Sequence, residues 1–534
     1  MNKRIAVVAL AAMSLVATGC KDFLTEVPQD FVGPSNFYRN ASDAVAAVNS
    51  AYASFVLLPS TLNNVSTNMS SDDYYGRNFY LLAELPTESM TNRLGATNER
   101  EIIDNYSGVT SGHVYFANLW RAAYFAINKA NAVTDHVPGI DMDTALRSRV
   151  LGEAKFLRSL HYFNLVRFFG GVPLKVHETA GLDSLQLPRA TAAATYDRII
   201  ADLKDAAASL PTTYGSKDYG RATKGAALTQ LGKVYLQRGA TGVGTATDFA
   251  TAADYFRQVV QLGVYRLDAN FGSLFDGTNE QSPEIIFAVQ NAAVSGAGGQ
   301  LGKYMMPSKP IGGNSGQNAF QIEFPFLNSW ADTDKRKAGS LLLSWVDKSG
   351  KTIPWLATSA GVSAYGSTGP VPRKFIDVTS QGSGLDACDY VLLRYADVLL
   401  SLAEAVNRAT GPTAEAYDAV NQVRARAGVP ALTPGLAQAA FQDSVFLERR
   451  YEFFAEGQGL FDSQRNWQWA KTRIQANIHQ APTLNKSPLT SSVPKWPNSA
   501  GPEPQVTDNF KLWPIPDRAV QLDPQLAGQQ NPGW

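Results

Sequence analysis

Apolar side chains recur at intervals of three and four residues along most of the chain, which is the pattern of amphipathic helices. The clearest stripes lie in residues 118–137, 145–169, 191–210, 222–239, 249–263, 392–408, 413–427 and 437–456. The second stripe stops at Gly170 and Gly171 with Pro173 just beyond, which is a common way for a helix to end. We therefore predict a mainly α-helical fold.

Two of these predicted helices resemble the halves of a tetratricopeptide repeat. Gly232 would let the helix backbones approach closely, while Tyr235 and Phe256 fill the space between them. An insertion at residues 241–248 breaks the repeat's usual period of about 34 residues. The stripes on either side of Gly411 form a second pair. Stacked helix pairs bury a continuous core and leave loops at one edge, so we assign the pairs to a binding scaffold without chemistry of their own.

Three long stretches lack helical periodicity and are rich in Gly, Pro or Ser. They are residues 291–318, 344–373 and 480–508. Helices do not persist in such sequences, so we expect irregular loops with minor β-hairpins. Loops of this length inside a compact chain are usually functional or mobile.

The first twenty residues have the parts of a secretory signal. Two basic residues precede an apolar run over residues 5–16, which is shorter than the ~20 residues of a membrane-spanning helix. Cys20 directly follows small residues, as in a bacterial lipobox, although Ala17 stands where Leu is usual. We predict that residues 1–19 are removed as a lipoprotein signal peptide and that Cys20 carries acyl chains such as palmitate. The alternative is an ordinary signal peptide with a coincidental cysteine.

The processed chain would begin with a lipidated tether, residues 20–32. We expect an N-terminal helical region with the repeat-like pairs at residues 33–270, and a C-terminal region with ligand loops and late helices at residues 271–534. Apolar residues make up 45% of the chain and charged residues 18%, so a large core is possible and a disordered protein is excluded.

Charge and metal-binding residue types limit the possible partners. The chain has 47 basic and 47 acidic residues with no run of either sign, which argues against a nucleic-acid binder. Two Cys and five His give neither a disulfide framework nor a multi-His metal site. We therefore predict no metal and no cofactor. Cys388 lies among acidic residues that would raise the pKa of its thiol, so we interpret it as a buried bystander.

A search for catalytic motifs finds no zinc-protease, nucleophile-elbow, P-loop or dinucleotide-binding pattern. Three acid pairs are compatible with a glycosidase or with Ca²⁺ ligation. They are Asp72 with Asp73, Glu99 with Glu101, and Asp332 with Asp334. Such pairs also arise by chance among 47 acids. His161 lies on an apolar stripe and is interpreted as a core residue. We predict that the chain is not an enzyme.

Many short segments, in order along nearly the whole chain, resemble the SusD/RagB family of Bacteroidetes-type outer-membrane nutrient-binding lipoproteins. These segments are residues 20–24, 120–131, 152–158, 162–163, 169–174, 220–227, 394–400, 403–407, 421–428, 448–453, 456–457, 514–516 and 530–534. Two positions depart from the family pattern, since Gly459 replaces a usual Arg and Trp534 a usual Tyr. Both concern packing and chain termination.

This resemblance implies a mostly helical fold with tetratricopeptide-like pairs as its platform. It also implies a non-catalytic protein, anchored by lipid in the outer membrane and facing the cell surface. Its partners would be an oligosaccharide or other oligomeric nutrient and a SusC-like TonB-dependent outer-membrane transporter to which that nutrient is delivered. Two alternatives remain open: a surface glycoside hydrolase using a carboxylate pair, and a structural assembly subunit without a soluble ligand.

Ligand residues are predicted from the chemistry of sugars, because no motif anchors the ligand loops. A sugar ring offers an apolar face and several hydroxyls, so its site needs aromatic rings beside carboxylates, amides or guanidinium groups. Residues 72–80 are the densest such cluster, and a Tyr-rich hairpin packed on the core is the alternative interpretation. The candidate residues are Asp72, Asp73, Tyr74, Tyr75, Arg77, Asn78, Tyr80, Asn92, Tyr304, Trp345, Trp355 and Tyr365.

Overall fold

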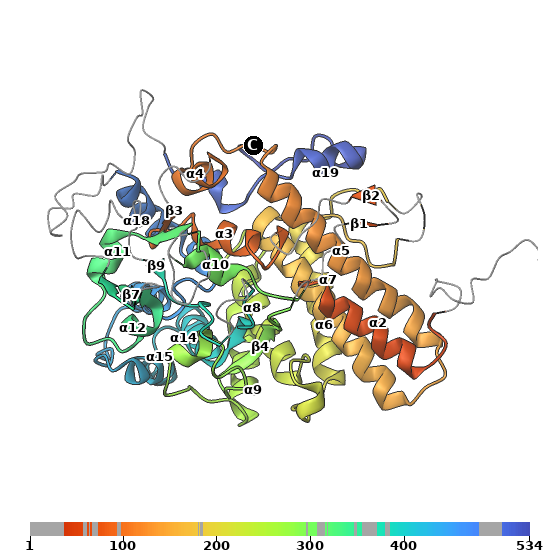
Figure 1. Cartoon of the computed structure of the whole chain (residues 1–534), viewed down its shortest axis with the longest axis horizontal. Helices are drawn as coiled ribbons and strands as arrows, with labels where there is room; N and C mark the ends of the chain where they lie inside the picture. The colour runs from red at the N-terminus through yellow and green to blue at the C-terminus, as the bar shows by residue number, and fades with distance from the viewer. Residues whose placement is uncertain are drawn as a thin grey trace, which may run out of the picture.

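The computed structural model is mainly helical (Figure 1). It describes residues 37–56, 61–62, 65–66, 73–92, 98–179, 181, 185–294, 297–306, 316–317, 319–346, 350–354, 371–379, 385–479 and 505–534. The helices are α2 (Ala41–Ala53), α3 (Asn78–Glu84), α4 (Asn98–Asn105), α5 (Val114–His136), α6 (Thr144–Phe169), α7 (Ala192–Ser209), α8 (Lys224–Gly239), α9 (Asp248–Gln261), α10 (Leu301–Met305), α11 (Phe324–Ser329), α12 (Arg336–Ser340), α14 (Tyr395–Thr410), α15 (Ala414–Ala427), α16 (Gln438–Glu452), α17 (Gly459–Arg465), α18 (Trp467–His479) and α19 (Asp517–Leu522). None of the described helices is both long and apolar enough to cross a membrane.

The long helices form a continuous row in which each packs on the next. The order is α5, α6, α7, α8, α9, α14 and α15, with α2 lying against α5 and α6 (Figure 1). The row therefore passes directly from α9 to α14, and the intervening chain leaves it to form short elements on one side. This arrangement confirms the predicted mainly α-helical fold built from helix pairs.

Local sequence explains where the helices of the row begin and end. Thr191, Thr223 and Thr413 each accept a hydrogen bond from a backbone N–H of the first turn. Helix α6 ends at Gly170 and α15 at Gly428, both with positive φ angles (75° and 72°), a conformation that glycine adopts without a Cβ clash.

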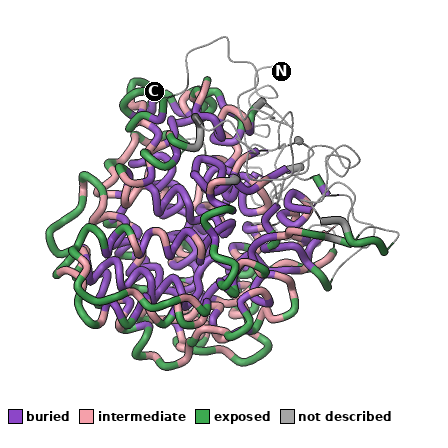
Figure 2. Tube along the Cα trace, turned by 90° about the vertical axis from the view of Figure 1, so that its left-hand side faces the viewer, coloured by how far each residue is buried: buried purple, intermediate pink, exposed green. Residues whose placement is uncertain are grey.

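The predicted repeat contact between α8 and α9 is confirmed. A Cβ added to Gly232 would lie 2.6 Å from the ring of Phe256, so only glycine allows this close approach. Gly232 is buried, and Phe256 and Tyr235 both belong to the hydrophobic core. Burial runs through the centre of the row, while the exposed residues lie mainly at its edges and loops (Figure 2).

The described strands form two-stranded antiparallel sheets. They are β1 (Thr61–Leu62) with β2 (Val65–Ser66), β3 (Met90–Asn92) with β5 (Phe320–Ile322), β4 (Ile285–Val289) with β10 (Tyr390–Arg394), β6 (Leu341–Leu342) with β9 (Val371–Pro372), and β7 (Ser344–Val346) with β8 (Thr352–Pro354). Minor β-hairpins were predicted, but pairings between distant segments were not. The β3–β5 pair joins regions on either side of residue 270, and the division of the chain at that point stays a prediction.

Two helix predictions need correction. The stripe at 392–408 begins in strand β10, because the fully buried run Tyr390–Arg394 pairs with β4 before α14 starts at Tyr395. The Gly-rich segment 291–318 was expected to hold no helix, yet it contains the short helix α10. Four of the five residues of α10 are buried, and this tertiary packing outweighs the poor helix propensity of the surrounding sequence.

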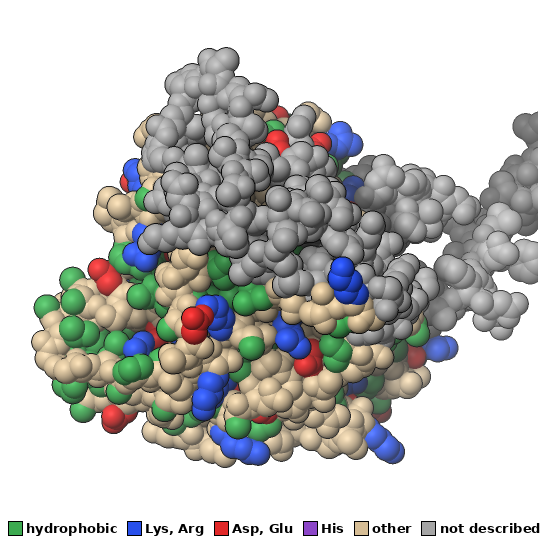
Figure 3. Space-filling view, turned by 60° about the vertical axis from the view of Figure 1, so that its left-hand side comes forward, with side chains coloured by type: hydrophobic (Ala, Val, Ile, Leu, Met, Phe, Trp, Pro, Cys, Tyr) green, Lys and Arg blue, Asp and Glu red, His purple; other side chains and the backbone are tan. Residues whose placement is uncertain are grey.

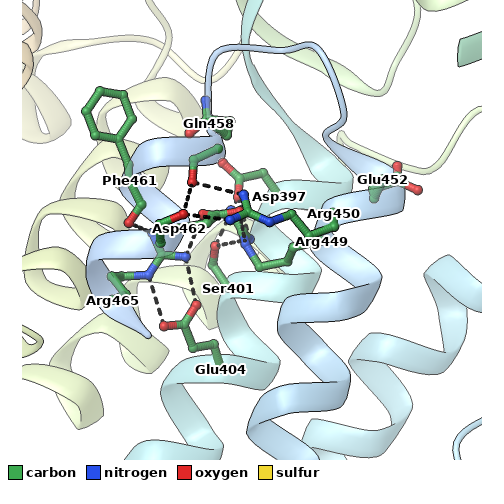
Figure 4. Close-up of polar contacts among 12 residues, drawn as sticks. Asp397, Ser401, Glu404, Arg449, Arg450, Glu452, Gln458, Phe461, Asp462 and Arg465 are labelled. Carbon is green, nitrogen blue, oxygen red and sulfur yellow. Dashed lines mark hydrogen bonds and ion pairs between the residues drawn. The ribbon is translucent and has the colours of Figure 1, made fainter. Parts of the chain in front are cut away.

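A network of buried ion pairs fixes the C-terminal helices to one another (Figure 4). Arg449 on α16 lies 2.9 Å from both Asp397 on α14 and Asp462 on α17, and Arg465 lies 2.8 Å from Glu404. All five side chains are at most 7% exposed. Buried charges are tolerated only when they are paired and hydrogen-bonded, so the network specifies how these helices pack.

Candidate functional site

The rings of the Tyr-rich segment point into the core. Tyr74, Tyr75 and Tyr80 are 0%, 3% and 0% exposed. The Tyr74 hydroxyl lies 2.6 Å from Nδ1 of His161, and the Asn164 amide donates to the hydroxyls of Tyr74 and Tyr75. Burial raises the pKa of Tyr75 to about 12. The prediction that these rings stack on a sugar is wrong, because no ring face is open to a ligand.

His161 is the core residue that its apolar stripe predicted. It is fully buried, and burial lowers the pKa of its imidazole to about 3, so it remains neutral at physiological pH. Cys388 is likewise buried, and the pKa of its thiol is raised well above its usual value, first by burial and then by Asp377 and other nearby acids. Neither residue has the character of a catalytic group.

Two polar candidates of the same segment are also buried. Asp73 is 4% exposed, and its carboxylate accepts a hydrogen bond of 2.8 Å from Asn118 and pairs with Arg121 at 3.2 Å. Asn78 is 0% exposed and accepts a hydrogen bond from Arg77 Nε at 3.2 Å. These two side chains therefore hold neighbouring groups in place and are not open to a ligand.

Arg77 is brought together with Tyr304, which lies 227 residues later in the chain. Its Nη1 donates to the Tyr304 hydroxyl at 3.2 Å, and its guanidinium lies 5.3 Å from the ring centroids of both Tyr304 and Tyr115. Cation–π contacts of this kind hold a guanidinium in a fixed orientation. Arg77 is half-buried, whereas Tyr304 and Tyr115 are 4% and 7% exposed. The rings thus position the cation and do not themselves face solvent.

Helix α5 adds polar groups beside Arg77. Asn118 and Arg121 are one turn apart and half-buried, and the Arg121 side chain is 40% exposed. Both are fixed through Asp73, the neighbour of the Tyr-rich run. We call this cluster the Arg77–Tyr304 face; its members are Arg77, Tyr115, Asn118, Arg121 and Tyr304. Its accessible groups are guanidinium and amide donors, which suit hydroxyl-rich ligands.

Sequence reasoning found Arg77 and Tyr304 but missed the three members on α5. The signal was present in the α5 sequence, where Asn118 and Arg121 are polar residues three apart beside an otherwise apolar stripe. Residues three apart on a helix lie on the same face, so the Asn118 and Arg121 side chains extend from α5 in the same direction.

Asn92 lies in strand β3 opposite Phe320 of β5, whose ring is 6.3 Å from that of Tyr304. Asn92 is 5% exposed, and its amide nitrogen and oxygen have no hydrogen-bond partner among the described residues. The backbone N–H of Asn92 donates to Asp104. Asn92 is thus near the Arg77–Tyr304 face, but its side chain is below the surface.

The remaining candidates lie outside the described residues. These are Asp72, Trp355 and Tyr365, together with Cys20 and the predicted signal peptide and tether. Trp345 is in strand β7, but its side chain is likewise not among those described. Their proposed roles in binding or lipidation stay predictions. Among the residues that are described, no group of His, Cys, Asp or Glu is arranged to hold a metal ion.

Helix α10, which carries Tyr304, is docked tightly on a neighbouring loop. A Cβ on Gly302 would lie 2.4 Å from the backbone oxygen of Phe375 and 2.8 Å from the Asp386 carboxylate. The Gly302 N–H donates to that carboxylate at 3.0 Å. Burial, and secondly Asp377, raises the pKa of Asp386 to about 7. The contact that holds α10 in place therefore depends on whether the Asp386 carboxyl is protonated.

Replacing Asp386 with Asn should change how stability depends on pH. Because its folded pKa is raised from 3.8 to about 7, the carboxyl contributes stability below about pH 4 that is lost as the pH rises towards 7. Asn stays neutral, so from pH 4 to pH 8 the variant should gain about 2–4 kcal/mol relative to the parent chain. Urea unfolding at both pH values measures this gain. A difference independent of pH would contradict the assignment.

Comparisons with known proteins fit this architecture, a row of paired helices with short inserted elements. A profile described as "SusD family" matches residues 283–534, and one described as "Starch-binding associating with outer membrane" matches residues 45–236. Together the two profiles span most of the chain. The chain belongs to the SusD family, as the sequence resemblance predicted.

Individual relatives agree with this assignment. The chain is 26% identical over 482 residues to SusD-like protein P2 of Formosa agariphila, covering 86% of this chain and 90% of that one. It is 29% identical over 219 residues to starch-binding protein SusD of Bacteroides thetaiotaomicron, covering 40% and 37%. The crystal structure of a SusD homolog from Bacteroides thetaiotaomicron superposes with a TM-score of 0.77 at 25% identity, covering 93% of this chain and 98% of that one. A laminarin-binding SusD-like protein has the same fold (TM-score 0.69, 23% identity, 93% and 100% covered).

Proposed function

We propose that this protein binds glycans non-catalytically at the outer membrane. The observation that carries the proposal is the Arg77–Tyr304 face, where two half-buried guanidinium groups and an amide are held rigidly on a helical scaffold. Such fixed donors can bind several sugar hydroxyls without paying the entropy of ordering long side chains. Family membership supports the ligand class, because one matching profile is described as starch-binding and one relative is named a starch-binding protein.

The delivery role completes the proposal. Lipid on Cys20 holds the protein at the cell surface, and the row of long helices faces a SusC-like TonB-dependent barrel that imports the bound nutrient. The row is suited to this contact because it is a rigid surface, while Arg77, just before α3, and Tyr304, in α10, lie outside the row. The outer-membrane association in the description of one matching profile supports this location. Copurification of a barrel transporter with the intact protein tests it.

The alternative of a glycoside hydrolase finds little support in the Asp332–Asp334 pair. Asp334 is 5% exposed and bound to Arg336 at 2.7 Å, while Asp332 is exposed and bound to Lys337 at 2.5 Å. A general acid needs a carboxyl with access to the substrate, and Asp334 has none. Turnover of a polysaccharide by the purified protein would support the hydrolase, and the absence of any ligand would support a purely structural subunit.

Replacing Arg77 with Ala should weaken glycan binding about 10- to 100-fold, because hydrogen bonds from a charged donor contribute about 1.5–3 kcal/mol. Calorimetry with the purified protein and a panel including starch and laminarin fragments measures the change. Tyr304→Phe, which removes only the hydroxyl that Arg77 binds, should weaken binding several-fold without unfolding the chain.

Arg39→Ala is the matched control, because Arg39 is an exposed arginine just before α2 that pairs with Asp43. It should leave the affinity unchanged. If Arg77→Ala and Tyr304→Phe bind every ligand of the panel as tightly as the parent chain, the Arg77–Tyr304 face is not the glycan site.

A further inference from the structure

A cavity that the Arg77–Tyr304 face does not include lies between the 3₁₀ turn Gly272–Phe275 and helix α12. Its volume is about 370 Å³, within the range of about 300–1,000 Å³ typical of small-ligand pockets. A Cβ on Gly339 would lie 3.0 Å from Cα of Gly272, so these two glycines let the walls of the cavity meet at close range. Helix α12, which forms one wall of the cavity, is labelled in Figure 1.

Four cationic side chains line this cavity: Lys335, Arg336, Arg373 and Arg426. Two of them already form ion pairs with buried carboxylates. Arg336 pairs with Asp334, Glu448 and Glu452, and Arg426 pairs with Glu284 and Glu452.

The other two cations are available to a ligand. Lys335 and Arg373 are exposed, and neither forms an ion pair with a described residue. Arg373 donates through Nη1 to the backbone oxygen of Ala338, which directs it to the cavity wall. Asp276 is the one acid in the lining, and its Oδ1 is already bound by Thr278. The cavity therefore carries a net positive charge.

Uncharged polar groups complete the lining. The Asn270 side chain is exposed, whereas Ser273 and Phe271 are buried in the wall of the cavity. An exposed amide next to two cations matches the hydroxyls and the anionic group of an acidic sugar. On the face drawn in Figure 3, Lys and Arg side chains are interspersed with Asp and Glu side chains below the grey atoms, so the positive charge available to an anionic saccharide is that of the cavity lining itself.

We propose that this cavity binds an acidic monosaccharide unit through its carboxylate or sulfate group, with Lys335 and Arg373 as the anion-binding residues. It is a second saccharide site, separate from the Arg77–Tyr304 face and independent of the function proposed for that face. Its role would be to give the protein a preference for glycans that carry acidic units.

Calorimetry on the purified full chain with galacturonate, glucose and inorganic sulfate tests this site. Galacturonate should bind, and the double substitution Lys335→Gln with Arg373→Gln should weaken its binding at least 10-fold. Raising the salt concentration should also weaken binding, because the anion contacts are partly exposed. The control is Lys337→Gln on α12. The Lys337 side chain pairs with Asp332 and is not in the lining, so this variant should bind galacturonate like the parent chain.

Three results would overturn the proposal. The first is that galacturonate does not bind, or binds equally well to the double variant. The second is that glucose binds as tightly as galacturonate, which would remove the role of the cations. The third is that inorganic sulfate binds as tightly as galacturonate, which would make the cavity a simple anion site and not a sugar site.

Discussion

Replacing Glu452 with Gln is expected to lower the free energy of unfolding by about 3–5 kcal/mol, the usual cost of removing one partner from a buried ion pair. The Glu452 carboxylate is fully buried and bound by Arg336 at 2.9 Å, by Arg394 at 2.5 Å and by Arg426. Gln keeps the shape of the side chain but removes its charge, so three guanidinium groups lose a shared counter-ion. Urea unfolding followed by tryptophan fluorescence measures the loss.

The pH dependence gives this prediction a second observable. Burial acts to raise the pKa of Glu452, but Arg426, Arg394 and Arg336 outweigh it and hold the pKa well below its usual value of 4.5. A depressed pKa contributes stability above about pH 4.5 that is lost as the pH falls. The difference between Glu452→Gln and the parent chain should therefore shrink in acid.

Glu415→Gln is the matched control, because Glu415 also binds an arginine, Arg257, at 2.7 Å but is 40% exposed. Exposed pairs contribute about 0–1 kcal/mol, so this variant should be nearly as stable as the parent chain. Equal losses for the two variants would show that burial does not set the strength of the network.

Replacing Cys20 with Ala should move the protein from the membrane to the soluble fraction almost completely. Each buried CH₂ of an acyl chain contributes about 0.8 kcal/mol to membrane binding, and several chains make attachment effectively stable. The lipid on Cys20 is the proposed anchor of the chain. Cell fractionation with immunoblotting measures the distribution, and mass spectrometry of the native N-terminus detects the acyl groups.

The other cysteine provides the control for this experiment. Cys388 is 4% exposed in the core, so Cys388→Ala should leave the protein in the membrane fraction. A Cys20→Ala protein that stays with the membrane in high salt would contradict the lipid anchor.

The helices of the row were predictable because each is long, amphipathic and marked by local end signals. Thr191 at the start of α7 and Gly170 at the end of α6 are local features whose effect does not depend on the rest of the fold. The predicted ranges accordingly agree with the structure to within a few residues. The exception is at 392–394, where a buried apolar run fits a strand as well as a helix and only pairing with β4 decides between them.

The site was harder to predict because burial, which decides its chemistry, depends on distant parts of the chain. Tyr74, Tyr75 and Tyr80 lie among polar residues in the sequence and so look accessible. In the structure α3 is buried along its whole length, and the hydroxyls of Tyr74 and Tyr75 are bound within the core. A tyrosine can lie in the core with its hydroxyl hydrogen-bonded or at the surface with its ring exposed. Residue composition alone therefore does not predict which tyrosines face a ligand.

The meeting of Arg77 and Tyr304 across 227 residues also fixes when the proposed glycan site can exist during biosynthesis. Ribosomes add about 5–20 residues per second, so Arg77 is made roughly 10–45 s before the tyrosine that orients it. A nascent or prematurely terminated chain that ends before α10 would have the helical row as far as α9 but not the completed face. Cells that shorten this protein from its C-terminus would thus lose ligand capture while still producing the first half of its scaffold.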